Sequence, residues 1–174
     1  MMQKTFDLGF KFKHIDPNYS SFGMHYVIDD VRNYTVNGGL RLFDQKFTFQ
    51  GSYGIQLNNV KNVRKNTSTR NIMHLNASIL PIKNGGLQLM YSNYSIDQTP
   101  GFAMVNDSFR LIQQTAITSI TPFYRISGKK NRQQFTINYN RSAITDVSPV
   151  EIENRDGNIT TISGSWSYDH TITK

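Results

Sequence analysis

Few side chains in this sequence have the types and spacing that chemistry requires, and His74 is the first to consider. Asn76 and Ser78 follow it at two-residue intervals, so the three side chains would share one face of a strand. A histidine in such surroundings is a candidate general base for a set of serine, histidine and acid. The same neighbours also satisfy the hydrogen bonds of an ordinary polar histidine. We predict this simpler role, and no catalytic residue.

Possible metal ligands do not reach the spacing of a metal site. His14 lies two residues from Asp16, and Asp169 directly precedes His170, but neither pair matches a zinc centre. The acidic stretch 143–158 offers oxygen ligands for Ca²⁺ without the pattern of an EF-hand loop. Cysteine is absent, which excludes thiolate metal sites, disulfides and a cysteine nucleophile. The sequence therefore predicts no metal and no cofactor.

Four basic side chains fall on what we interpret as the polar faces of strands. If these faces share one enclosed interior, the cations would line it together with His74 and favour the passage of anions, or they would pair with Asp7 and acids of the loops and plug it. The predicted lumen-lining residues are Lys11, Arg41, His74, Arg125 and Arg141.

The element that must position such residues is clearest in the stretch 47–57, which reads FTFQGSYGIQL. Its odd-numbered positions are apolar apart from one glycine, and its even-numbered positions carry Thr, Gln, Ser or Gly. This period of two is that of a β-strand whose faces meet different surroundings. A soluble sheet usually carries Lys and Glu on its wet face, whereas uncharged polar residues suit a confined, water-lined interior. The stretch is also about as long as a tilted strand that crosses a bilayer.

Similar alternation recurs along the chain and predicts a fold class that is all-β, an antiparallel up-and-down meander of about eight strands. Such a meander would form a membrane β-barrel or part of one. Residues 1–174 are expected to be a single barrel domain or a fragment of a larger barrel. The expected strands cover about 5–13, 34–43, 47–57, 71–80, 87–95, 114–126, 133–141 and 159–170.

Aromatic side chains lie near the ends of these strands on the apolar faces. Membrane barrels carry such aromatic girdles at both limits of their apolar band. The predicted girdle residues are Tyr34, Tyr91, Tyr124, Tyr139, Trp166 and Tyr168.

The connections between the expected strands alternate strictly between long and short. The short ones lie near Asp44, Asn84 and Gly128, and Asn84 with Gly85 is a natural pair for positive φ angles. Outer-membrane barrels have this asymmetry, with short turns at one end and long loops at the other. Pro122 lacks a backbone donor and predicts a local defect within its strand. The segment 22–28, inside the first long loop, is a candidate for a short extra strand.

Composition sets wider limits. The chain has 174 residues, of which 37% are hydrophobic, and no apolar run is long enough for a transmembrane helix. The formal net charge of +7 would suit nucleic acid, but the basic residues cluster at 61–70 and 129–132, where strands end. Nucleic-acid binding requires a continuous basic face with stacking aromatics. We therefore expect no nucleic-acid partner.

The segment from His14 to Asn59, with the basic, Asn-rich loop after it and then LQLMYSNYSIDQTPG, resembles outer-membrane β-barrel proteins of the Bacteroidetes type. The resemblance covers roughly two thirds of the chain and carries no diagnostic motif. It implies placement in a bacterial outer membrane with membrane lipid as the partner. It also implies a longer chain with a signal peptide, of which these residues would be a segment.

These observations lead us to expect a barrel protein with a structural, surface, transport or channel role and no catalysis of its own. The same alternation is compatible with a soluble, lipocalin-like barrel whose apolar faces point inward and bind a small apolar ligand. The alternation indicates that the two faces of each strand meet different surroundings. It does not indicate which face points toward the interior of a barrel.

Overall fold

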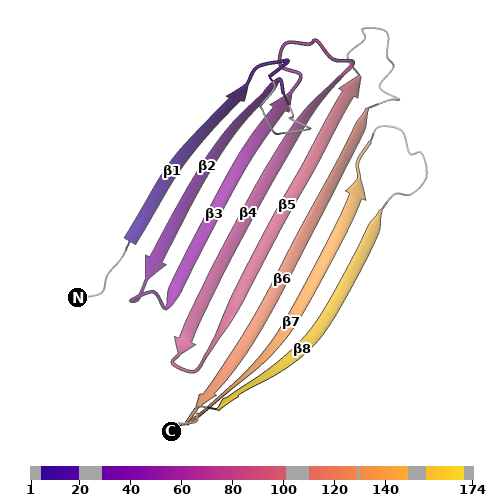
Figure 1. Cartoon of the computed structure of the whole chain (residues 1–174). Helices are drawn as coiled ribbons and strands as arrows, with labels where there is room; N and C mark the ends of the chain where they lie inside the picture. The colour runs from indigo at the N-terminus through magenta and orange to yellow at the C-terminus, as the bar shows by residue number, and fades with distance from the viewer. Residues whose placement is uncertain (1–4, 20–28, 101–109, 129, 149–155, 171–174) are drawn as a thin grey trace.

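The computed structural model describes residues 5–19, 29–100, 110–128, 130–148 and 156–170. These residues form eight antiparallel strands in a single up-and-down sheet, in which each strand pairs with its neighbours in sequence. Figure 1 shows the strands side by side from β1 at one edge to β8 at the other. The predicted all-β meander is confirmed.

The strands are long, and β4 to β7 are the longest. Strand lengths range from 11 residues in β1 to 17 residues in β4 and β6. Their bounds are β1 Thr5–Ile15, β2 Val31–Leu42, β3 Phe47–Asn58, β4 Asn66–Ile82, β5 Gly85–Pro100, β6 Leu111–Ser127, β7 Asn131–Asp146 and β8 Gly157–His170.

The register of the strands sorts the side chains onto two faces. Directly paired residues share a face, and one such row runs across β1 to β4 through Phe10, Val36, Tyr53 and Met73. We call this side the apolar face. The opposite side, the polar face, carries the neighbouring row of Asp7, Gly39, Gln50 and Asn76.

The expected alternation of connections is confirmed. Residues 43–46, 83–84 and 128–130 join strands at one end of the sheet, the lower end in Figure 1. Residues 16–30, 59–65, 101–110 and 147–156 join them at the other end, which we call the long-connection end.

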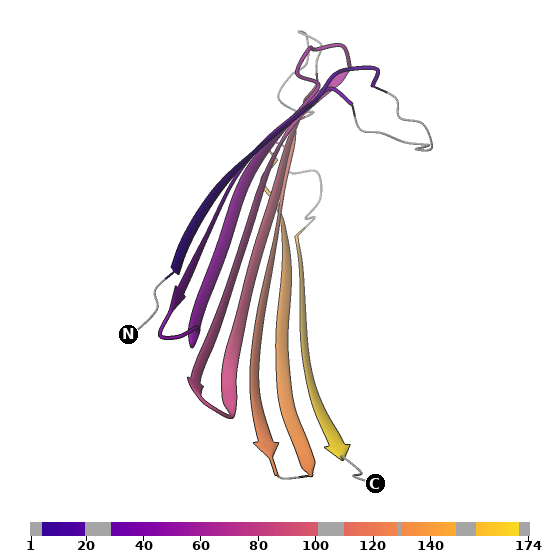
Figure 2. The same cartoon turned by 60° about the vertical axis from the view of Figure 1, so that its left-hand side comes forward.

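The sheet is a single open layer. It is twisted, and β1 and β8 lie at opposite edges without pairing to each other (Figure 2). Val31 is the only buried apolar side chain among the described residues, while Phe6, Leu8 and Trp166 are 70%, 71% and 62% exposed. Domains normally bury an apolar face against a second layer, and the described residues supply no such layer.

Most strands extend further toward the long connections than the alternation predicted. β4 begins at Asn66 and not near residue 71, and β5 continues to Pro100. The cause is a reversal of polarity in this part of the sheet. Asn71 and Asn93 lie on the apolar face there, while Ile72 and Ile96 lie on the polar face. When apolar residues move from odd to even positions within one strand, the regular alternation is lost, and the sequence there resembles a loop.

Local backbone features agree with the sequence in part. Pairing between β6 and β7 is interrupted at Pro122, as its missing donor predicted. The prediction of positive φ angles at Asn84 and Gly85 is wrong, since no described glycine and no residue of that turn has a positive φ angle. A register shift between Ile79 and Ile82 accommodates the turn instead. The possible extra strand at 22–28 lies outside the described residues.

Gly86, beside this turn, provides a test of the register. A Cβ there would lie 2.6 Å from Leu80 Cδ2, 2.7 Å from the carbonyl oxygen of Ile79 and 2.9 Å from the Phe123 ring. The carbonyl belongs to the paired strand and cannot move without disturbing it. We expect Gly86→Ala to lower the free energy of unfolding by about 1–3 kcal/mol, measured by urea denaturation.

The matched control is Gly164→Ala on β8. A Cβ there would meet nothing nearer than the carbonyl oxygen of Thr136, at 4.0 Å. Its unfolding midpoint should stay near that of the wild type. Equal midpoints for the two variants would contradict the β4–β5 register.

Candidate functional site

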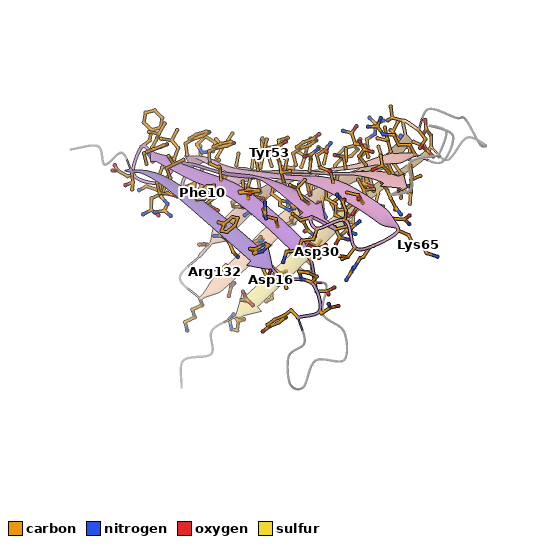
Figure 3. All side chains as sticks on the ribbon, turned by 90° about the horizontal axis from the view of Figure 1, so that it is seen from above. Phe10, Asp16, Asp30, Tyr53, Lys65 and Arg132 are labelled. Atoms are coloured by element: carbon orange, nitrogen blue, oxygen red, sulfur yellow. The ribbon has the colours of Figure 1, made fainter. Side chains whose placement is uncertain are left out.

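The two faces of the sheet are the candidate functional surfaces, because the register sorts apolar and polar side chains onto opposite sides. The described residues contain no group of three or more potential metal ligands. Figure 3 shows the sheet from above, that is from the long-connection end. Tyr53 lies on one side of the sheet, and the loop residues Asp16 and Asp30 lie on the other.

Four of the five predicted lumen-lining residues lie on the polar face. Lys11 pairs with Thr35, and Arg41 pairs with Thr48. His74 lies in β4 and Arg125 in β6, also on this face. They come from four different strands and form no cluster.

Arg141 was wrongly grouped with these residues. It pairs with Thr118 of β6 and Thr160 of β8, in the row that also contains Tyr91 and Leu75. That row belongs to the apolar face. The Arg141 Nε donates to Asn158 Oδ1 at 3.3 Å.

Sequence reasoning missed other cations on the polar face. Arg70 was assigned to a loop, although its pairing with Gln56 places it in β4. The reversed alternation of residues 69–72 was the signal that would have placed it. In the described strands the polar face carries six cations and three acids, namely Lys11, Lys13, Arg41, Arg70, Arg125 and Arg132 against Asp7, Asp146 and Asp169.

Short polar side chains on the polar face satisfy one another across the strands. Asn138 Oδ1 accepts hydrogen bonds from Ser119 Oγ at 3.2 Å and from Thr121 Oγ1 at 3.0 Å. Arg125 Nε donates to Gln134 Oε1 at 2.8 Å. A hollow of about 320 Å³ with mixed polar and apolar lining lies over β3 to β6, between residues such as Gln50 and Ser119.

His74 has a hydroxyl partner. Its Nδ1 lies 2.9 Å from the Oγ of Ser92, which is directly opposite on β5. A serine and a histidine in contact are two members of a nucleophilic set, but no carboxylate hydrogen-bonds the His74 ring within the described residues. The observed contact is the one expected for a hydrogen-bonded histidine.

The apolar face carries a band of apolar side chains with a clear limit toward the long connections. At this limit the first polar residue on each strand is His14, Arg32, Asn71, Asn93, Thr118, Arg141 or Thr160, and β3 alone stays apolar to its end. His14 and Arg32 pair with each other, whereas Thr118, Arg141 and Thr160 lie in the row of Leu8. The limit therefore shifts by six residues, from His14 to Leu8, between β1 and β8.

The band thus crosses the strands obliquely. Six residues correspond to about 20 Å along a strand, and seven strand spacings to about 34 Å across the sheet. The limit of the band is therefore inclined by about 30° to the direction perpendicular to the strands. Strands in membrane barrels are tilted by roughly 35–45°.

All six predicted girdle residues lie on the apolar face. Tyr34, Tyr91 and Tyr139 are the last band residues before the oblique limit. Tyr124, Trp166 and Tyr168 lie at the opposite limit, near the short connections. Tyr91 and Tyr139 are mid-strand, so their expected position near strand ends was wrong. Their girdle role remains a prediction.

The long-connection end contains the most buried polar groups among the described residues. Asp30 is 0% and Asn59 is 1% exposed. Asn59 Nδ2 donates to the carbonyl oxygen of Arg64 at 2.9 Å, and Asn59 Oδ1 accepts from Arg64 N at 2.8 Å. The carboxylate of Asp30 accepts from the backbone N–H of Lys61 at 3.3 Å. The bonds of Asn59 stabilise the second long connection, and the bond between Lys61 and Asp30 joins it to the first.

Asp16 adds a charged link between the same connections. The Nζ of Lys61 lies 3.2 Å from Asp16 Oδ1, and the Nε2 of His14 lies 3.4 Å from the same oxygen. The hydrogen bond and charge of Lys61, followed by those of His14, lower the pKa of Asp16 below its ordinary value.

The fold defines the class of the protein as an open, eight-stranded antiparallel meander with one apolar and one polar face. No family model, curated protein or solved structure matches the chain. None of the described residues belongs to a helix long and apolar enough to cross a membrane.

The Asp16 link gives a pH-dependent prediction. A lowered carboxyl pKa stabilises the joined connections above the ordinary pKa, and this contribution disappears as the pH falls through the lowered value. We expect Lys61→Gln to raise the pKa of Asp16, because the main group that favours the carboxylate is removed. The measurement is an NMR titration of the Asp16 carboxyl carbon.

Lys65→Gln, in the same connection, is the control, because among the described residues the charged groups that act on Asp16 are Lys61 and His14 and not Lys65. It should leave the Asp16 titration unchanged. A pKa of Asp16 that is the same with and without Lys61 would contradict the link.

Proposed function

We propose that this chain forms wall strands of an outer-membrane β-barrel, with the apolar face against lipid and the polar face toward an aqueous interior. The chain would serve a structural, surface, transport or channel role with no catalysis of its own. The observation that carries the proposal is the oblique apolar band limited on both sides by aromatic residues. A planar hydrocarbon layer requires this geometry of tilted strands, because its surface cuts each successive strand at a different residue.

The strand lengths support the same placement. A tilted strand needs about 9–11 residues to cross the hydrocarbon layer, whereas β4 has 17 and β5 has 16. The excess lies at the long-connection end, where Asn71 and Asn93 make the apolar face polar. Strands that project beyond the lipid would meet water on that face, and the reversal fits this arrangement.

The polar face suits a water-lined interior. Its strands carry six cations against three acids, so the interior would favour anions. Some of its hydroxyl and amide groups bond to one another, as Asn138 does with Ser119 and Thr121.

A pair of tryptophan reporters distinguishes the two faces. Trp166 is the only tryptophan, so Phe135→Trp and Phe123→Trp, each with Trp166→Phe, carry one reporter each. Position 135 is on the apolar face and position 123 on the polar face, in neighbouring strands and adjacent rows. In vesicles, we expect brominated lipid to quench fluorescence at 135 and aqueous iodide to quench it at 123.

The soluble, lipocalin-like alternative predicts another result. Its apolar face would be inward, so brominated lipid would quench neither reporter and the chain would stay in buffer without detergent. Either observation would overturn the membrane proposal.

A charge on one face tests the same orientation energetically. Leu75 and Asn76 are neighbours in β4 on opposite faces. A lysine on the lipid-facing side of a barrel costs about 2–4 kcal/mol near the middle of the bilayer. We expect Leu75→Lys to lose this amount of stability in vesicles, measured by urea titration of the folded fraction, and Asn76→Lys to lose little. Equal losses would refute the assignment of the faces.

A further inference from the structure

The apolar face is not uniformly filled. A groove of about 440 Å³ lies over β1 to β4, where Gly38 stands directly opposite Gly51. Two paired glycines leave both positions without side chains, so the groove has a floor of backbone. Its walls are apolar and include Phe6, Val36, Phe49, Tyr53, Met73 and Leu75.

The surrounding side chains do not close this groove. A Cβ at Gly51 would approach Leu75 Cδ2 to 3.1 Å and the Phe49 ring to 3.6 Å, so these groups lean over one end of the floor. A Cβ at Gly38 would meet only ordinary contacts, at 3.5 Å from the carbonyl oxygen of Asp7 and 3.8 Å from Leu8. A larger side chain at Gly38 would therefore fit the backbone and fill the groove.

A cation lies on the same strand and the same face. Arg32 marks the oblique limit of the band on β2, and it makes no ion pair within the described part of the chain. Arg141 lies at the same limit on β7. The one acid on the apolar face of the described strands, Asp97, accepts hydrogen bonds from Arg110 at 3.0 and 2.6 Å. The limit is therefore cationic.

The distance along β2 between Arg32 and the groove is close to the length of strand that crosses one leaflet of a bilayer. Arg32 and Gly38 are six residues apart on β2, which is about 20 Å along the strand. Half of a hydrocarbon core of about 30 Å, crossed at the slope of about 30° found for this sheet, corresponds to about 17 Å of strand. A lipid with its headgroup at Arg32 would thus extend an acyl chain down to the floor of the groove.

We propose that Arg32 and the Gly38–Gly51 groove hold one anionic, phosphate-bearing membrane lipid. The headgroup phosphate accepts hydrogen bonds from the Arg32 guanidinium, and one acyl chain lies in the groove. A planar guanidinium binds phosphate well, with paired hydrogen bonds. The site rests on the proposed function, because the groove must face lipid.

Native mass spectrometry of the full chain tests this site. The chain is inserted into vesicles of equal parts phosphatidylglycerol and phosphatidylcholine and then released in mild detergent. We expect the wild type to retain phosphatidylglycerol about tenfold over phosphatidylcholine, because both phosphates accept hydrogen bonds but only phosphatidylglycerol has a net negative charge that attracts Arg32. Arg32→Gln should remove that preference, and Gly38→Leu should reduce the retention of both lipids.

Two variants serve as matched controls. Arg125→Gln removes a cation of the polar face, and Gly164→Leu adds the same side chain to the apolar face outside the groove. Both should retain lipid as the wild type does. An equal loss in these controls would overturn the site.

The outcomes also separate the two proposals. Bromolipid quenching at position 135 without any preference for phosphatidylglycerol would overturn the lipid site alone. Quenching at neither reporter would overturn the membrane placement and the lipid site together. An unchanged lipid preference in Arg32→Gln would show that the headgroup is not held there.

Discussion

The structure depends on an apolar face that the described part of the chain does not cover. Eight strands form one layer, and Val31 is its only buried apolar side chain among the described residues. The polar face carries groups that water can hydrate, and some of them, such as Asn138 and Arg125, also bond to neighbours on the same face. Apolar side chains gain stability only by leaving water. Within the described residues nothing covers the apolar face, so the contact that would stabilise it lies outside them, and the oblique outline of the band is the feature such a contact must match.

Register converts an alternating sequence into an oblique band. Each strand carries its own apolar run, and hydrogen bonding between strands fixes how far each run is displaced from the next. The displacement accumulates from the His14–Arg32 row at β1 to the Leu8 row at β8. A second protein layer would need complementary apolar residues along the same oblique band, whereas fluid lipid can contact such a band at any tilt of the strands. Aromatic residues at both limits are suited to the boundary between apolar and aqueous surroundings.

Much of this fold was predictable from the sequence, because strand alternation and turn residues are local signals. The eight strands, the segregation of long and short connections and the defect at Pro122 follow from residues close together in the chain. The outer parts of β4 to β7 were not predictable in this way. There Asn71 and Ile72 exchange the faces that Leu75 and Asn76 occupy, and only pairing with a neighbouring strand shows that the strand continues. The buried Asn59 was missed for a related reason, since its partners depend on how the second connection folds back.

The cations show most clearly what register adds to sequence. A net charge of +7 describes a basic protein, but it does not separate Arg125 from Arg141. Pairing places Arg125 on the polar face, where it lies over the Phe123 ring and bonds to Gln134. The same pairing places Arg141 two residues beyond Tyr139 on the apolar face, at the limit that Arg32 also marks. A guanidinium at that limit keeps its charge hydrated while its stem covers apolar surface. The chain thus divides its positive charge between the two faces of the sheet, and the cations Arg32 and Arg141 of the apolar face lie at the oblique limit.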